Sequence, residues 1–350
     1  MSRWVLTCAC LTMAWLAGVD AQKPLDPAKS KTKTQAAVVN ETLAAQVMLD
    51  RAGFSPGEID GRAGANLRRA ATAFQSAHGV PASGAVDDQT WAKLLEISAV
   101  TEPLITYEIA AADVAGPFVE KIPADLVEQS KLKALGYTSP LEALAERFHA
   151  SQALLKSLNP GATFGAGERI MVPNVVEPVD AAPVPEARGT TGTAPARTAR
   201  TGRATGTAPR DPEPAPTAII YVRKATSSLT VEEGGRVAFH APVTVGSEHD
   251  PLPVGSWKVT TVQRMPAFHY NPDLFWDANP AHSRARIPAG PNNPVGVVWI
   301  DLTKEHYGIH GTPEPGRVGH TESHGCIRLT NWDALRVARW AKKGTTVIFE

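Results

Sequence analysis

The chemistry in this sequence centres on one cysteine, Cys326, which follows Ser-His-Gly and precedes Ile-Arg at positions 323–328. Four of the ten histidines fall between His306 and His324, and Arg328 stands two residues after the cysteine. The thiolate is the nucleophilic form of cysteine, and neighbouring bases and positive charges favour it. Cys326 is therefore the leading candidate for a covalent catalyst, and we expect an ionised sulfur activated by a nearby imidazole.

Three kinds of site could use these residues. A zinc site would use His and Cys ligands, and the pairs His306/His310 and His320/His324 have the spacing that a helix brings together. Four glycines interrupt this segment and disfavour a helix. The second interpretation is a glycine-rich loop with a buried, inert thiol. The third is a Cys-His catalytic pair, which we favour, and it predicts neither a metal nor a cofactor.

Residues 1–21 have the pattern of a cleaved signal peptide. One positive charge precedes the apolar run 4–18, and Ala21 provides a small residue for cleavage before Gln22. The apolar run is short for a membrane span, so we expect no stable span after cleavage. Cys8 and Cys10 lie in this segment and would be lost with it. The sequence thus predicts an exported protein, in the periplasm or cell wall, with one thiol and no disulfide.

Composition narrows the remaining possibilities. With 35 basic and 35 acidic residues, the formal net charge is zero, and no charge excess indicates nucleic-acid binding. The 350 residues suffice for two or three domains. Residues 176–216 are rich in Ala, Thr, Gly, Pro and Arg without apolar periodicity, which predicts a linker.

Residues 40–97 predict a small all-α domain of three helices. Apolar residues recur at helical spacing on both sides of the turn-rich loop 53–61. This loop, with Ala73-Phe74-Gln75, Ser83-Gly84-Ala85-Val86 and Thr90-Trp91, resembles the helical peptidoglycan-binding domain. The resemblance implies contact with peptidoglycan glycan strands or stem peptides.

Residues 101–175 predict a small α+β module. A strand at 105–109 precedes a helix start at Ser139-Pro140, a second helix from Ser151, and a strand at 167–173. This order is similar to the lysin motif (LysM), a glycan-binding module, although about 25 extra residues separate the first strand from the helices. A plain helical spacer is the alternative.

Residues 217–350 predict a mostly-β domain with one late helix. Asn331 is a candidate cap for that helix, which would run from about 332 to 343. A sandwich or a partly open barrel would fit this pattern. The predicted strands are 218–222, 228–232, 236–240, 257–262, 297–302 and 345–349.

Motifs in this last domain resemble the catalytic domain of the L,D-transpeptidases, which form peptidoglycan cross-links by cysteine chemistry. They are Leu252-Pro253-Val254-Gly255, the run 287–296, Ile309-His310-Gly311-Thr312, and 323–329. The resemblance implies that Cys326 is the nucleophile and His310 the proton acceptor and donor, oriented by the carbonyl of Gly311.

The resemblance also implies roles for neighbouring residues. Gly325 and His324 would form the oxyanion region, and His324 would lower the thiol pKa or exchange roles with His310. Arg328 suits either a substrate carboxylate or the local fold. The candidate substrate-binding residues are Arg328, Ser323, Thr312, Trp299 and Tyr270, although core packing is the alternative for the aromatic residues.

The implied reaction is a two-step acyl transfer. Cys326 attacks the carbonyl between the diamino acid and D-Ala of a tetrapeptide stem, D-Ala leaves, and an acceptor amine resolves the thioester. The acceptor would be a second stem or a protein, and carbapenem β-lactams would acylate the same sulfur. Two alternatives remain open: hydrolysis of the thioester by water, as in an L,D-carboxypeptidase, and an inactive peptidoglycan-binding scaffold.

Overall fold

The computed structural model describes residues 40–176, 178 and 218–350. The predicted signal peptide and nearly all of the predicted linker lie outside these residues. Val38–Glu350 form one compact unit. In the ranges that are described, no helix combines the length and the apolar character needed to cross a membrane.

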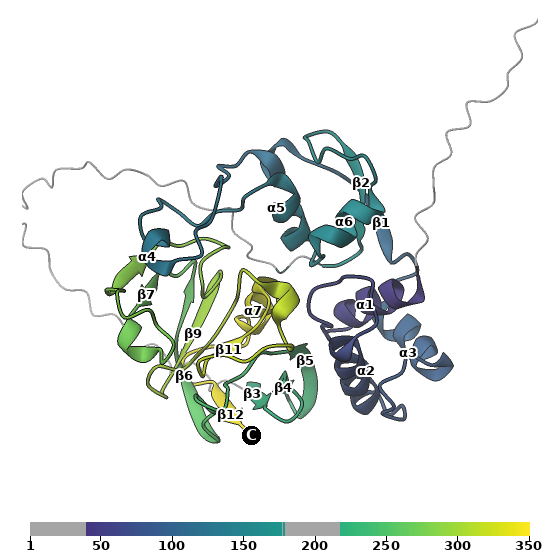
Figure 1. The fold of residues 1–350 in the computed structure, drawn as a ribbon. Coiled ribbons are helices and arrows are strands. Elements are labelled where there is room, and N and C mark those ends of the chain that lie inside the picture. The colour runs from purple at the N-terminus through teal and green to yellow at the C-terminus, as the bar shows by residue number, and fades with distance from the viewer. Residues whose placement is uncertain (1–39, 177, 179–217) are drawn as a thin grey trace, which may run out of the picture. The chain divides into compact units, whose positions relative to one another are not determined.

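Three helices form the first domain, as predicted, and Figure 1 labels them. Asn40 caps the first helix by accepting a hydrogen bond from the amide of Leu43 at 2.7 Å, and Asp87 caps the third through the amide of Thr90 at 2.9 Å. The apolar faces meet around Phe74, which is fully buried. The helices are α1 (Glu41–Arg51), α2 (Ala65–Ala77) and α3 (Asp88–Ser98).

The second module has the predicted order of strand, two helices and strand. Its two strands pair antiparallel, and the hydroxyls of Ser139 and Ser151 cap the two helices. The identification of this module as a lysin motif stays a prediction. Its elements are β1 (Leu104–Glu108), η1 (Ala111–Val114), α4 (Leu126–Gln129), α5 (Pro140–Arg147), α6 (Gln152–Leu158) and β2 (Arg169–Pro173).

The last domain is built on one eight-stranded sheet, and all six predicted strands are present in it. The strand order is β11-β10-β9-β6-β12-β3-β4-β5. Those strands are β3 (Ala218–Arg223), β4 (Ser228–Glu233), β5 (Arg236–Pro242), β6 (Gly255–Arg264), β9 (Val298–Leu302), β10 (Gly308–His310), β11 (Ile327–Arg328) and β12 (Thr346–Phe349). The other elements are the hairpin β7 (Phe268–Tyr270) and β8 (Ala285–Ile287), the turns η2 (Pro272–Leu274) and η3 (Pro315–Arg317), and α7 (Asn331–Val337).

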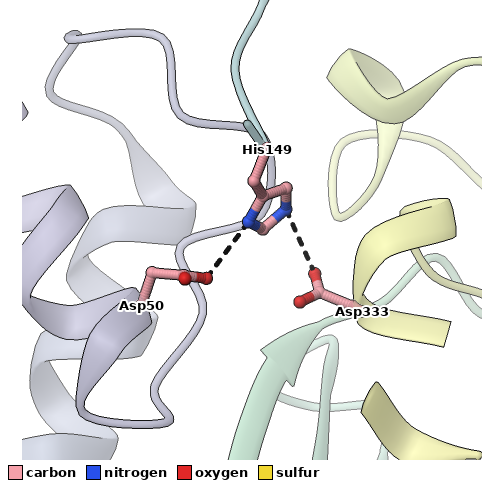
Figure 2. Close-up of side chains that lie close together, drawn as sticks. All are labelled: Asp50, His149 and Asp333. Carbon is pink, nitrogen blue, oxygen red and sulfur yellow. Dashed lines mark hydrogen bonds and ion pairs between the residues drawn. The ribbon is translucent and has the colours of Figure 1, made fainter. Parts of the chain in front are cut away.

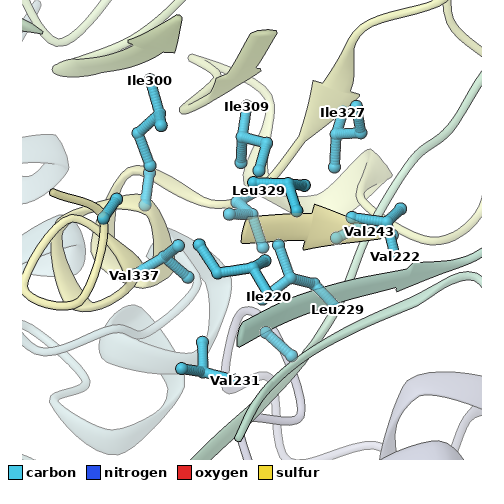
Figure 3. Packing of buried hydrophobic residues seen from close by; sticks show 14 of the residues in the cluster. Ile220, Val222, Leu229, Val231, Val243, Ile300, Ile309, Ile327, Leu329 and Val337 are labelled. Atoms are coloured by element: carbon cyan, nitrogen blue, oxygen red, sulfur yellow. The ribbon is translucent and has the colours of Figure 1, made fainter. Parts of the chain in front are cut away.

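Strand β6 gives this sheet its curl. Its first residues pair with β12, whereas its later residues pair with β9, and the β6–β9 register shifts between Val259 and Thr261. A bulge of this kind bends a strand and increases its twist. The sheet is therefore a partly open barrel and not a two-sheet sandwich. Its concave face packs on α7, and Figure 3 shows Val337 of this helix among core residues such as Ile220 and Ile300.

The start of helix α7 differs from the prediction. Thr330, not Asn331, caps the helix, because its hydroxyl accepts a hydrogen bond from the amide of Asp333 at 3.0 Å. The side chain of Asn331 turns into the protein instead. Its Oδ1 accepts from the amide of Val297 at 3.1 Å, and its Nδ2 donates to Glu146 at 3.0 Å. The helix also ends earlier, at Val337.

A buried polar cluster joins the three parts of the chain (Figure 2). Nδ1 of His149 lies 3.1 Å from Oδ1 of Asp50, and its Nε2 lies 3.8 Å from Oδ2 of Asp333. Arg336 contacts the same Asp50 oxygen at 3.0 Å, and Ser55 donates to Asp333 at 2.9 Å. The imidazole thus links a carboxylate on α1 to another on α7.

Charge balance explains how these groups are tolerated in the interior. Burial by itself would lower the pKa of His149, but the carboxylates of Asp333 and Asp50 outweigh it and raise the pKa. A protonated His149 together with Arg336 neutralises the two carboxylates. Buried charges are retained only when they are paired in this way, because removing one partner leaves the others uncompensated.

We expect His149→Asn to lower the unfolding free energy by about 3–5 kcal/mol near pH 6. Asn tolerates the positive φ of 50° at this position but cannot bridge both carboxylates. Because the folded pKa is raised, the contribution is complete below the ordinary histidine pKa of about 6.5 and is lost as pH rises through the folded value. Urea unfolding of variant and wild type at pH 6 and pH 9 measures this difference.

Lys93→Ala is the matched control, because it removes a partly exposed ion pair with Glu96. Its effect should stay within about 0.5 kcal/mol at both pH values. A His149→Asn penalty that does not change between the two pH values would contradict a charged imidazole.

Candidate active site

Two short parallel strands put Cys326 and His310 on the same side of the sheet. Ile309 pairs with Ile327, and His310 pairs with Arg328. Cys326 directly precedes β11, so it shares a face of the sheet with Arg328, and paired residues on neighbouring strands also share a face. The side chains of Cys326 and His310 therefore lie on the same face, and the amide of Gly308 contacts the cysteine sulfur.

His310 is held in one tautomer. Its Nδ1 lies 2.6 Å from the carbonyl oxygen of Gly311, which can only accept a hydrogen bond, so Nδ1 carries the proton and Nε2 is the basic nitrogen. The ring stacks on Trp299 with centroids 5.4 Å apart. Burial, with help from the charge of Arg328, lowers the pKa of His310 to about 3. The imidazole is therefore neutral at physiological pH.

Cys326 is partly exposed, and its thiol lies 3.7 Å from the carbonyl oxygen of His306. Burial raises the pKa of the thiol more than the Gly308 amide and the charge of Arg328 lower it. The expected ionised sulfur is therefore not the resting state in this geometry, because the neighbouring imidazole is itself too weakly basic to take the proton before substrate binds. The resting pair is a neutral thiol beside a neutral imidazole.

This resting state has a measurable pH dependence. We expect alkylation of Cys326 by iodoacetamide to rise by about two orders of magnitude between pH 6 and pH 8.5, because the thiol pKa lies above its ordinary value of about 8.5. Mass spectrometry of quenched samples gives the rate. A plateau in the rate between pH 5 and pH 8 would instead indicate a thiolate–imidazolium pair.

His324 faces a different partner from the one expected. Its Nε2 lies 2.8 Å from Oδ1 of Asp277, and its ring contacts Phe275 with centroids 5.2 Å apart. It is not among the groups that shift the pKa of Cys326. These contacts favour His310 over His324 as the base. Asp277 has no role in the sequence analysis, although it directly follows the aromatic pair Phe275-Trp276.

Gly325 has no room for a side chain. Its φ is +99°, and an added Cβ would approach the ring of Tyr307 at 3.0 Å. The neighbouring Ser323 is buried, and its hydroxyl donates to the carbonyl oxygen of Cys326 at 2.6 Å. Both residues therefore fix the conformation of the loop that carries the sulfur. Because the Ser323 hydroxyl already forms this internal hydrogen bond, a structural role is favoured over contact with a substrate.

Two of the predicted substrate-binding residues line a common pocket. Thr312 and Arg328 border a cavity of about 100 Å³. Among the described residues, no carboxylate lies within ion-pair distance of Arg328, so its guanidinium is available to an anionic group. The remaining lining residues are Thr244, Glu314, Arg317, Val318, Thr321 and Glu322.

Trp299 and Tyr270 serve packing in this structure. Trp299 supports the ring of His310. Tyr270 is 4% exposed and lies in an apolar cluster with Leu135 and Ile287, so its ring cannot reach a substrate. Proximity in sequence suggested a substrate contact for Tyr270, but its side chain packs in a cluster between the hairpin and residues 122–135.

The histidines considered as zinc ligands do not form such a group. In the part of the chain with described coordinates, the one set of three metal-ligand side chains within reach of each other is Asp50, His149 and Asp333. There, the Asp50 oxygen already contacts both His149 and Arg336. The cluster thus pairs charges within the protein, although Oδ1 of Asp333 is buried without a hydrogen-bond partner among the described residues.

Comparisons with known proteins agree with both resemblances. A family model of the L,D-transpeptidase catalytic domain matches residues 217–349, and a model of a putative peptidoglycan binding domain matches residues 39–94. The putative L,D-transpeptidase YqjB of Bacillus subtilis is 30% identical over 135 residues, which are 37% of this chain and 69% of that protein.

Two further proteins are similar over a smaller share of their length. The putative L,D-transpeptidase YkuD of Bacillus subtilis is 30% identical over 128 residues, 37% of this chain and 63% of that protein. A solved L,D-transpeptidase from Mycobacterium smegmatis matches with 18% identity and a TM-score of 0.32, over 38% of this chain and 58% of that chain. The matched region thus spans less than two thirds of these two relatives.

Proposed function

Because this chain belongs to the L,D-transpeptidase family, we propose that it is a peptidoglycan L,D-transpeptidase that uses Cys326 as its nucleophile. The observation that carries the proposal is the shared face of Cys326 and His310, with Nδ1 of the imidazole tied to Gly311. A base in this tautomer offers Nε2 to the sulfur, as general-base activation requires.

In the first half-reaction, Nε2 of His310 takes the thiol proton as the sulfur attacks the carbonyl between the diamino acid and D-Ala. The C–S bond forms, and negative charge develops on the carbonyl oxygen, next to the Gly325 segment of the backbone. The C–N bond then breaks, the imidazolium gives its proton to the departing amine, and D-Ala leaves. A thioester on Cys326 remains.

In the second half-reaction, an acceptor amine attacks the thioester. His310 takes a proton from this amine and returns one to the sulfur as the C–S bond breaks, so the enzyme is regenerated and an amide is formed. We propose that a second stem peptide supplies the amine, with a protein amine as the other acceptor. Arg328 lines the pocket, and its guanidinium suits a carboxylate of the stem.

We propose that residues 39–94 hold peptidoglycan while residues 217–349 perform the transfer. We propose that the enzyme acts at the cell wall after export, because both matched domains belong to peptidoglycan-related families. The carbonyl of a carbapenem β-lactam would acylate Cys326 by the same first step, which makes such a compound a mechanism-based inhibitor.

The test is incubation of the purified, reduced protein with tetrapeptide-containing muropeptides, followed by mass analysis. A cross-linked dimer with release of D-Ala is the expected product. A tripeptide alone would mean that water resolves the thioester, and the enzyme would be a carboxypeptidase. Unchanged muropeptide, from protein that still alkylates at Cys326, would leave only a binding scaffold.

A further inference from the structure

The extra residues in the second module pack against the hairpin of the catalytic domain. These residues, 115–136, which we name the insert, contain helix α4 and separate η1 from α5. Their apolar side chains form one cluster with those of the hairpin β7–β8, and Leu135, Tyr270 and Ile287 are its buried centre. The partly buried members are Ile122, Leu126, Val127 and Leu132 from the insert, and Phe268, Phe275 and Ala285 from the hairpin side.

A series of hydrogen bonds also links the insert to the hairpin. Nε2 of His282 lies 2.8 Å from Oδ2 of Asp125, and its Nδ1 lies 3.1 Å from the hydroxyl of Tyr270. The other oxygen of Asp125 accepts from the amides of Val127 and Glu128, so the same carboxylate caps α4. The insert and the hairpin thus order one another at the start of α4.

The end of the insert is fixed to the segment that follows the hairpin. The amide of Leu135 donates to the carbonyl of Ala289 at 3.0 Å, and the amide of Asn292 donates to the carbonyl of Leu135 at 2.9 Å. A Cβ on Gly290 would lie 2.0 Å from the carbonyl oxygen of Leu135, which explains why glycine occupies this position. The backbone of the insert therefore continues the packing beyond β8.

The hairpin in turn contacts the active-site loop. Asp277 and Phe275, which lie between β7 and β8, contact the ring of His324 at 2.8 Å and 5.2 Å respectively. His324 is two residues before the nucleophile. Two strands of three residues are marginal by themselves, so the hairpin needs an outside surface to hold its conformation.

We propose that the insert is a positioning element that holds the hairpin β7–β8, and through Asp277 and Phe275 holds His324, in the geometry that accepts the acyl donor. This inference rests on the proposed function and extends it: a module upstream of the catalytic domain shapes the donor side of the site. A loosened hairpin should slow acylation by a large donor, because misplacement of a supporting group weakens alignment. It should not slow a small reagent that needs no positioning.

The experiment compares two reagents in the full-length protein. We make His282→Ala and the double variant Leu126→Ser with Leu132→Ser. Lys131→Ala is the control, because Lys131 lies in the insert just after α4 and its exposed ammonium forms an ion pair with the exposed Glu128. Mass spectrometry follows acylation of Cys326 by a carbapenem and alkylation by iodoacetamide. Hydrogen exchange of residues 268–287 reports whether the hairpin has loosened.

Both hairpin-facing variants should lose about tenfold to a hundredfold in carbapenem acylation, keep iodoacetamide alkylation within about twofold, and exchange faster over 268–287. Lys131→Ala should match the wild type. Unchanged acylation, or unchanged exchange, would overturn the proposal, and so would an equal loss with both reagents, which indicates general destabilisation. If the double variant fails to fold, His282→Ala alone decides.

The two proposals fail separately. If the wild type transfers nothing between muropeptides but the variants still loosen the hairpin and slow the carbapenem, the positioning role stands and the transpeptidase function falls. If the wild type cross-links muropeptides and both variants do so at its rate, the function stands and the positioning role falls.

Discussion

Cys326→Ala should reduce muropeptide transfer by about a millionfold, to background, because no other thiol is available to form the acyl intermediate. The only other cysteines, Cys8 and Cys10, belong to the predicted signal peptide. The thermal midpoint should stay within a few degrees of the wild-type value, since Cys326 is partly exposed and its thiol contacts two backbone groups, the His306 carbonyl at 3.7 Å and the Gly308 amide. Product analysis and calorimetry measure the two effects.

Cys326→Ser provides the matched control, because a hydroxyl preserves the shape of the site while removing thiolate chemistry. It should bind donor but form no carbapenem adduct. Turnover near that of the wild type in either variant would exclude a covalent cysteine mechanism. If the alanine variant shows a large fall in thermal midpoint, its loss of activity could come from unfolding. The serine variant then decides.

His310→Ala should slow acylation of Cys326 by about two to four orders of magnitude, the usual contribution of a positioned general base. Without Nε2 the neutral thiol has no group to receive its proton. His324→Ala should cost less, about tenfold, because it removes a contact with Asp277 and not the base. Mass spectrometry of the carbapenem adducts, in samples quenched at successive times, gives both rates.

The pH profile separates this role from a structural one. Since the pKa of His310 is lowered to about 3, wild-type acylation should show no loss of base between pH 8 and pH 5. A rate that falls below pH 6.5 would indicate an exposed, ordinary imidazole as base. A larger loss in His324→Ala than in His310→Ala would reverse the assignment.

Local sequence pattern predicted many of the elements and named the candidate reactive residues. It predicted six of the eight strands of the sheet, but not the short strands β10 and β11 that carry His310 and follow Cys326. Serine caps predicted where α5 and α6 begin. The glycines around Cys326 disfavoured a helical zinc site, and the motifs of this region resembled those of the L,D-transpeptidase family.

Tertiary structure decided what those residues face. Tyr270 turned into the hairpin core, and His324 turned toward Asp277, because partners distant in sequence compete for each side chain. The same holds for Asn331, whose side chain does not cap α7 and instead forms hydrogen bonds with Val297 and Glu146.

The sequence by itself determined three features of this chain: the pattern of a signal peptide, the motifs of a peptidoglycan-binding domain, and a cysteine in a segment rich in histidine. Only the folded chain decided the protonation of that cysteine, since burial raises its pKa and lowers that of His310. Folding also brings together the buried side chains of Asp50, His149 and Asp333, and it packs the insert against the hairpin β7–β8. The protonation and burial of a side chain depend on which distant segments pack around it, and a local sequence pattern does not reveal that packing.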